Sequence, residues 1–129
     1  MATLITNSGR AIVTNRVTGL GGTAPTYVGI GSGSTAAAAT DTALTTEYVT
    51  GTWSGYARVN VTPTRTTTSV ANDTASFSAT FTAPASETVA ECGNFDASTS
   101  GNMFIHSVFT GVALSSGDSI TCTLTYQLA

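Results

Sequence analysis

Apolar and polar residues alternate most regularly near the C-terminus of the chain. One face of the last run carries Ile120, Cys122, Leu124, Tyr126 and Leu128, and the residues between them are threonine or glutamine. Shorter alternations occupy residues 56–61 and 76–82. A period of two is typical of a strand with one packed face. These runs therefore predict three strands, each with a second face that is wet or meets a partner.

Turn residues separate the apolar runs. They occur at Thr62-Pro63, Asn72-Asp73, Ala83-Pro84, Ser100-Gly101-Asn102 and Ser116-Gly117-Asp118. A spacing of about ten residues per strand is typical of antiparallel sandwiches and barrels. A further strand is predicted at residues 27–30. Residues 102–109 are apolar on both faces, which predicts a central strand or one that another subunit covers.

One stretch near the N-terminus predicts a helix, from about Ser8 to Thr18. Asn7 or Ser8 can cap its first turn, and Gly19 stands where a helix would end in a left-handed residue. Val13, Val17 and Leu20 have helical spacing, which predicts that they form the packed face.

The composition agrees with an all-β fold. The chain contains 27 threonines, 14 serines and 13 glycines among 129 residues. β-branched threonine fits a pleated surface, whereas serine and glycine supply turns. We therefore predict an antiparallel β-sandwich, jelly-roll-like, with one short N-terminal helix. It would form a single domain over residues 1–129, with residues 1–24 as an N-terminal arm or helix segment.

Charge is scarce. The four basic residues are all arginines, seven residues are acidic, and the formal net charge is -3. Nucleic-acid and membrane-surface partners are therefore not expected, since both need clustered basic residues. The N-terminus lacks the pattern of a signal peptide, which predicts a protein made in a cytoplasm. Arg10 and Arg16, on the polar side of the predicted helix, are candidate residues for docking on a negative partner.

The two cysteines leave one question open. Cys92 and Cys122 both lie in predicted strands and could face each other across the core. A cytoplasmic protein usually keeps its cysteines as thiols, although a disulfide remains possible here. Their spacing does not fit a zinc site. We expect no metal and no cofactor.

Few residues suggest catalysis. His106 stands alone in an apolar strand, where a structural or interface role is expected. Glu87 and Glu91 could share a strand face, but a glycosidase would place such a pair in an aromatic cleft. The Gly29–Gly33 string lacks the surroundings of a phosphate loop, and a strand ending in a flexible turn is preferred. We therefore predict that the protein is not an enzyme.

Two sets of residues are candidates for binding. Trp53 and Tyr56 lie in a predicted loop and could stack on a sugar, although a core anchor is the preferred interpretation of Trp53. Met103, Phe104 and Phe109 exceed the apolar positions that one sheet face needs, which predicts an oligomer interface in a dimer or trimer.

Several stretches resemble small structural proteins of tailed bacteriophages. The stretches of this chain that carry the resemblance are Leu4–Arg10, Tyr27–Gly33 with the alanines after Thr35, Asp41–Glu47, Glu91–Asp96 and Leu114–Ile120. Cys92 and Asn94 depart from that pattern, so packing around them can differ. The resemblance spans nearly the whole chain and implies a virion component with a β-sandwich body. None of its motifs is catalytic.

Within a virion, two positions are open. The first is the capsid surface, where a decoration or cement protein would bind and stabilise the lattice of the major capsid protein. Many neutral hydrogen bonds from threonine, each worth about 1 kcal/mol, would suit that contact. The alternative is a tail fibre or a receptor-binding module that recognises host glycans through Trp53 and Tyr56.

Overall fold

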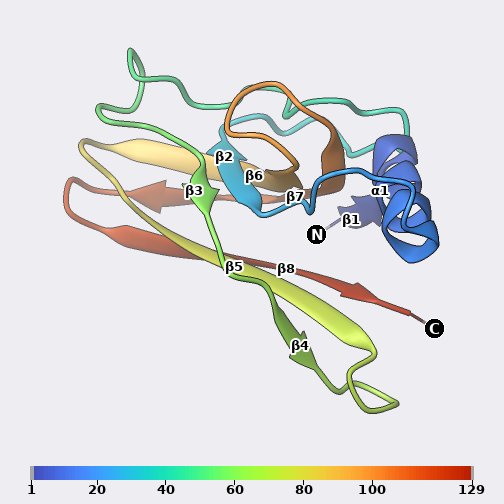
Figure 1. Ribbon diagram of the computed structural model, residues 1–129. Coiled ribbons are helices and arrows are strands. Elements are labelled where there is room, and N and C mark those ends of the chain that lie inside the picture. The colour runs from blue at the N-terminus through green and yellow to red at the C-terminus, as the bar shows by residue number, and fades with distance from the viewer. Residues whose placement is uncertain (1, 129) are drawn as a thin grey trace.

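The computed structural model describes residues 2–128, which form two antiparallel sheets and one helix (Figure 1). The elements are β1 (Ala2–Ile5), α1 (Asn7–Thr18), β2 (Tyr27–Gly31), β3 (Val59–Asn60), β4 (Thr64–Thr66), β5 (Thr74–Thr82), β6 (Glu87–Phe95), β7 (Met103–Leu114) and β8 (Ser119–Gln127). One sheet has the order β1-β7-β6-β2-β3, and the other has the order β4-β5-β8. The predicted all-β sandwich with one short helix is confirmed.

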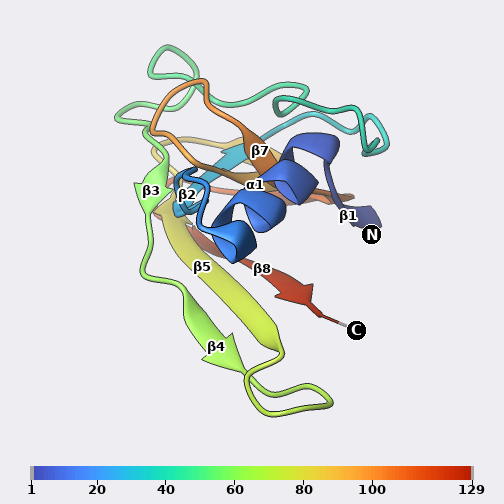
Figure 2. The ribbon, with the colours of Figure 1, turned by 45° about the vertical axis from the view of Figure 1, so that its right-hand side comes forward.

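Nested strand pairs link the two sheets. The hairpin of β6 and β7 lies in the five-stranded sheet, whereas the flanking strands β5 and β8 pair with each other in the three-stranded sheet. The chain therefore crosses between sheets after β5 and again after β7, which gives the sandwich a jelly-roll-like connection. The β4–β5 hairpin extends beyond the sheet that faces it (Figure 1, Figure 2).

Alternation works as predicted in the three-stranded sheet. Phe77, Ala79 and Phe81 are buried in β5, where they lie opposite Leu124, Cys122 and Ile120 of β8 respectively. The polar residues between them point outward and form exposed hydroxyl pairs across the two strands. These pairs are Ser78 with Thr123, Thr80 with Thr121 and Thr82 with Ser119, at 2.8–3.0 Å. We call this outer surface the hydroxyl face.

Alternation fails in β6, where every residue from Val89 to Phe95 is buried. The register with β7 shifts between Val89 and Glu91, because three residues of β7 lie opposite Ala90. The reason for the burial is a long irregular connection between β2 and β3, residues 32–58, that runs over the outer face of the five-stranded sheet (Figure 1). We call it the covering segment. It buries the strand face that a simple sandwich would leave wet.

Helix α1 begins one residue earlier than predicted and has a different cap. The Thr6 hydroxyl accepts a hydrogen bond from the Gly9 amide at 2.9 Å and donates one to the Met103 carbonyl at 2.6 Å. Thr6 therefore replaces Asn7 and Ser8 as the cap, because its hydroxyl also ties the helix to β7. Gly19 ends the helix with φ 71°, as predicted.

The packed face of α1 differs from the prediction. Ile12 and Gly9 are buried, whereas Val17 and Leu20 are about 80% exposed. A side chain on Gly9 would collide with the Phe104 carbonyl, so the helix approaches β7 along its glycine. Val13, also predicted on the packed face, is partly buried against the core, so only Val17 and Leu20 of that face point away from the sheet. In the part of the chain that the structure describes, no helix has the length and apolar character needed to cross a bilayer.

Candidate functional site

Three ionisable side chains from distant parts of the chain meet beneath the covering segment. His106 of β7 contacts Asp41 through Nδ1 at 2.6 Å and Glu91 of β6 through Nε2 at 2.9 Å. His106 is 1% exposed and Glu91 is fully buried. We call these three residues the acid–histidine cluster. Because Asp41 belongs to the covering segment, the cluster fastens that segment to the two central strands.

Glu91 also organises the backbone of the covering segment. Its carboxylate accepts hydrogen bonds from the amides of Gly33, Thr45 and Thr46 at 2.7–3.2 Å. Burial by itself raises the pKa of Glu91, but the hydrogen bonds from His106 and from the backbone outweigh it and hold the pKa below 4.5. The carboxylate is therefore ionised, and it supplies the acceptors that this irregular backbone needs.

The protonation of His106 follows from the same contacts. Burial alone lowers its pKa, but the hydrogen bonds to Glu91 and Asp41 favour the charged ring and raise the pKa above 6.5. The pKa of Asp41 is held below 3.8, because hydrogen bonds from Ala38 and His106 outweigh its burial. An imidazolium between two carboxylates is thus the stable state of the cluster.

The glycine string that ends β2 makes room for these contacts. A side chain on Gly31 would collide with the Thr46 carbonyl and with Glu91, and one on Gly33 would collide with Glu91 and Thr45. Neither glycine has a positive φ, so the requirement is for space. The motif that superficially suggests a phosphate loop is therefore a place where two backbone segments come unusually close.

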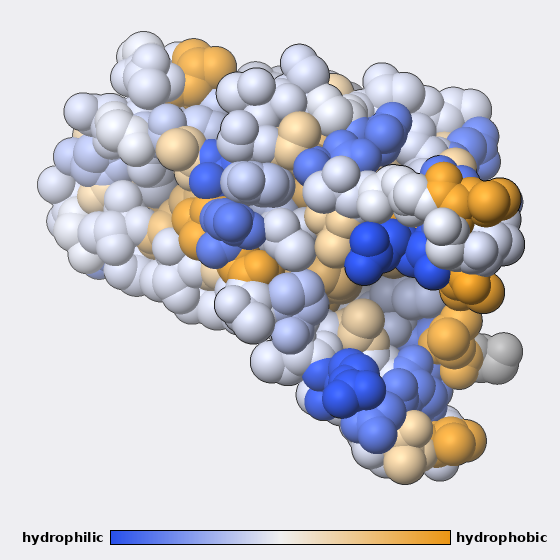
Figure 3. All heavy atoms as spheres, viewed as in Figure 1, coloured by the Kyte–Doolittle hydropathy of each residue, from blue (hydrophilic) through white to orange (hydrophobic). Residues whose placement is uncertain are grey.

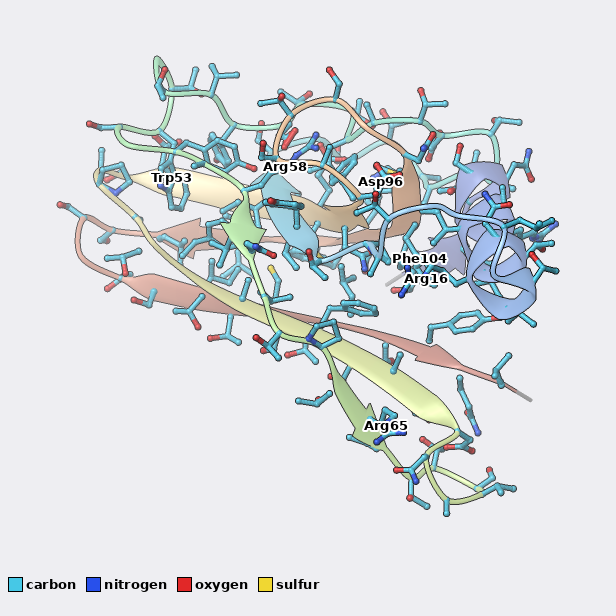
Figure 4. The ribbon with its side chains drawn as sticks, in the orientation of Figure 1. Arg16, Trp53, Arg58, Arg65, Asp96 and Phe104 are labelled. Carbon is cyan, nitrogen blue, oxygen red and sulfur yellow. The ribbon has the colours of Figure 1, made fainter. Side chains whose placement is uncertain are left out.

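A second set of contacts, the arginine clamp, holds the far end of the covering segment. The Arg58 side chain, 6% exposed, donates to Glu47 from Nε at 2.7 Å and from Nη2 at 2.9 Å. Its guanidinium stacks on the Phe95 ring at 3.5 Å from the centroid, and it donates to the carbonyls of Ala97 and Ser100. This bidentate, stacked geometry joins the covering segment to the β6–β7 turn (Figure 4).

Two open grooves lie on either side of residues 47–49 in the covering segment. The larger, about 820 Å³, is lined mainly by hydroxyl and acidic residues that include Thr46, Thr88 and Glu87. The smaller, about 520 Å³, runs past Arg58 to the turn at residues 98–100. Val49 stands between them and is 57% exposed. Loops held on a rigid sheet are common places for recognition, so these grooves form the candidate binding surface.

The two glutamates of β6 lie in different surroundings. Glu87 is partly exposed in the larger groove, whereas Glu91 is fully buried and contacts His106. The pair that the sequence allowed therefore does not line one open cleft, because Glu91 belongs to the buried acid–histidine cluster. Among residues 2–128, no cluster of histidine, cysteine or acidic residues could hold a metal ion.

The residues predicted to form an oligomer interface and those predicted to dock on a partner occupy different positions. Met103 and Phe104 are buried within the subunit, under the covering segment and against Tyr126 respectively, so the structure does not place them on an oligomer surface. Phe109 is partly buried against the core. The physical reason is that the chain itself covers both faces of the first half of β7, residues 103–108. Arg10 and Arg16 are exposed on α1, where the Arg16 guanidinium donates to the Gly22 carbonyl.

The structure does not support the proposed glycan platform. Trp53 is 4% exposed and packs on Tyr48 with ring centroids 4.9 Å apart, so no face of the indole is free for a sugar (Figure 4). The Tyr56 hydroxyl is occupied by Ile30 and Glu47, and its ring stacks on Phe81 of the opposite sheet. Trp53 is the core anchor that the sequence analysis preferred.

Sequence reasoning missed the acid–histidine cluster and the arginine clamp. Asp41 and His106 are 65 positions apart, and no spacing rule brings them together. One signal was available: a histidine and a glutamate inside apolar strands need partners once they are buried. That signal predicts the existence of partners but does not identify them.

The acid–histidine cluster predicts a stability that falls at both high and low pH. A histidine with a raised pKa contributes fully below its ordinary value of 6.5 and loses its contribution as the pH rises through the folded-state pKa. Glu91 and Asp41, with lowered pKa values, contribute above 4.5 and 3.8 and lose their contributions in acid. The cluster is therefore expected to stabilise the fold most between pH 4.5 and 6.5.

Thermal unfolding measured across the pH range checks this expectation. The difference in Tm between the wild type and His106→Gln is expected to be largest between pH 4.5 and 6.5 and to shrink toward alkaline pH. A difference that stays constant through the alkaline range would show that the charge of His106 contributes nothing.

The sequence model of one protein family, described as Podophage GP4 fiber I protein gp80, matches residues 5–126. A search of curated proteins gave no match. The matched range includes the acid–histidine cluster, the arginine clamp and the strands that form the hydroxyl face up to residue 126.

Proposed function

Because the chain belongs to the Podophage GP4 fiber I protein gp80 family, we propose that it is a subunit of a tail fibre. Membership makes the protein a structural component of a phage virion, in agreement with the resemblance found in the sequence. The family match over residues 5–126 is the observation that carries the proposal. A fibre favours the tail over the capsid surface, so the fibre alternative of the sequence analysis is preferred to capsid decoration.

The surface supports a role in assembly. Figure 3 shows a face of mostly intermediate hydropathy, with strongly apolar residues in small separate patches. The hydroxyl face carries paired threonines and serines and no ionisable side chain between residues 76 and 82 of β5. Such a face can contact neighbouring subunits through neutral hydrogen bonds without burying a charge. We propose that it lies against another protein in the fibre.

Receptor recognition is a second candidate function. The observation that favours it is the pair of grooves beside the exposed Val49, on a segment that the acid–histidine cluster and the arginine clamp fasten to the sheet. Hydroxyl and carboxylate groups line the larger groove and suit the hydroxyls of a saccharide. This surface takes the place of the Trp53 and Tyr56 platform, because the Trp53 ring is buried and only Tyr56 lines a groove.

Immunogold labelling of purified virions tests the fibre proposal. An antibody against this chain is expected to label tails, and labelled capsids with bare tails would contradict the proposal.

A matched pair of variants tests the hydroxyl face. Thr80→Arg puts a charge on this face and is expected to reduce incorporation into virions at least tenfold, whereas Thr14→Arg on the exposed side of α1 is expected to be incorporated normally.

Both variants must first be shown to fold, by circular dichroism and thermal unfolding of the purified chain. Normal incorporation of a folded Thr80→Arg variant would remove the hydroxyl face from the assembly contacts. That result would leave the tail position, which the antibody measures, unaffected.

A further inference from the structure

Two buried thiols face each other across the interior of the sandwich. Cys92 belongs to β6 of the five-stranded sheet and Cys122 to β8 of the three-stranded sheet. They are 4% and 5% exposed, lie in the same core cluster, and are both free. Cα atoms of β6 and β8 come within 8 Å of each other, a separation that allows side chains to meet.

The two thiols influence each other. The contact with Cys92 lowers the pKa of Cys122, whereas the contact with Cys122 and burial raise the pKa of Cys92. A thiolate is the form of cysteine that attacks a disulfide.

Small molecules can reach the pair through the open side of the sandwich. A groove of about 540 Å³ runs between β8 and the edge formed by β1 and β7, and both cysteines line it. Most of its other lining residues are small or apolar, including Thr3, Phe109 and Leu124. No proline or charged side chain lines this groove. An oxidant the size of a short peptide disulfide can therefore approach the sulfur atoms without unfolding the sheets.

We propose that Cys92 and Cys122 are an oxidation site that forms a disulfide between the two sheets after the virion leaves the host cell. Cytoplasmic thiols stay reduced during assembly, whereas proteins on virion surfaces meet oxidising conditions. The inference rests on the virion membership of the family and does not require the tail position. Its effect would be to join β6 to β8 and to fasten the side of the sandwich where the groove opens.

The reaction balances with a small-molecule disulfide as the oxidant. The Cys122 thiolate attacks one sulfur of that disulfide, which forms a mixed disulfide and releases one small thiolate. The Cys92 thiolate then attacks Cys122 and releases the second. The two protein thiols lose two electrons, the small disulfide gains them, and the two protons end on the released thiols.

Oxidation of the purified full chain tests the proposal. The folded reduced protein is incubated with glutathione disulfide, alkylated under denaturing conditions and weighed intact. We expect a monomer that has lost two hydrogens and carries no alkyl group, with a Tm about 5 °C or more above that of the reduced protein. Cys92→Ser and Cys122→Ser each remove one partner, so neither is expected to gain Tm with the oxidant.

The comparison of oxidised and reduced wild type does not depend on how well either variant folds. If the wild type still carries two alkylated thiols after incubation with the oxidant to equilibrium, the proposal is overturned. Glutathione adducts or disulfides between chains would overturn it as well. Purified virions give the second measurement. Alkylation of the virions under denaturing conditions is expected to find this chain without free thiols, and free thiols in mature particles would overturn the role after release.

Discussion

Replacing His106 by alanine is expected to lower the free energy of unfolding by about 3–5 kcal/mol. The change removes the imidazolium and leaves the fully buried Glu91 carboxylate with backbone donors alone. Asp41 loses the same partner. Breaking a buried ion pair costs more than the pair contributes, because the remaining charge stays away from water. Thr45 and Thr46, whose amides bind Glu91, are expected to lose protection first.

Urea unfolding and amide hydrogen exchange check this expectation. Glu87→Gln is the matched control, since it changes a partly exposed carboxylate in β6, the strand that carries Glu91, and its expected effect is below about 1 kcal/mol. Exchange is expected to rise in the covering segment of His106→Ala before it rises in β5 and β8. A loss below 1 kcal/mol for His106→Ala would mean that the acid–histidine cluster does not hold the segment.

Trp53→Ala is expected to cost a similar amount, about 3–5 kcal/mol, through a different mechanism. Trp53 is 4% exposed and is part of the main core cluster, where it packs against Tyr48. Truncation leaves a cavity between the covering segment and the sheets. Any loss of host adsorption in this variant is therefore expected to follow the loss of folded protein and not the loss of a sugar-stacking ring.

Two companion variants separate the mechanisms. Trp53→Phe keeps an aromatic ring in the core and is expected to recover part of the stability. Val49→Ala changes the exposed residue between the grooves and is expected to leave the Tm within about 2 °C of the wild type. A Trp53→Ala protein with wild-type Tm and no adsorption to host cells would restore the stacking platform and contradict the core assignment.

Local signals in the chain were sufficient for much of the fold. The alternation in residues 76–82 and 120–128 corresponds to β5 and β8, and Asn72, Ser100, Gly101 and Gly117 adopt positive φ at three of the predicted turns. Such signals work because a strand with one wet face imposes a period of two on its own residues. The end of α1 at Gly19 was predictable for a similar reason. A helix commonly ends in one residue with a left-handed backbone, and glycine is the residue that adopts it most easily.

Local sequence patterns failed to predict the packing wherever the covering segment lies on the five-stranded sheet. The apolar run in residues 102–109 predicted either a central strand or one covered by another subunit, and β7 is a central strand covered by the same chain. Met103 is buried against Leu44, from a segment whose composition indicated only a loop. The first of these two alternatives is thus confirmed, and the oligomer expected from the apolar surplus stays a prediction.

The sequence by itself determined the class of the protein: an all-β protein, rich in threonine and poor in charged residues, that resembles phage structural proteins. Tertiary structure alone decided which residues hold it together and which remain for partners. Period and composition act over a few neighbouring residues, whereas the acid–histidine cluster, the arginine clamp and the facing thiols join residues that are 11 to 65 positions apart. Their partners are set by how the sheets and the covering segment pack, and no local pattern contains that information.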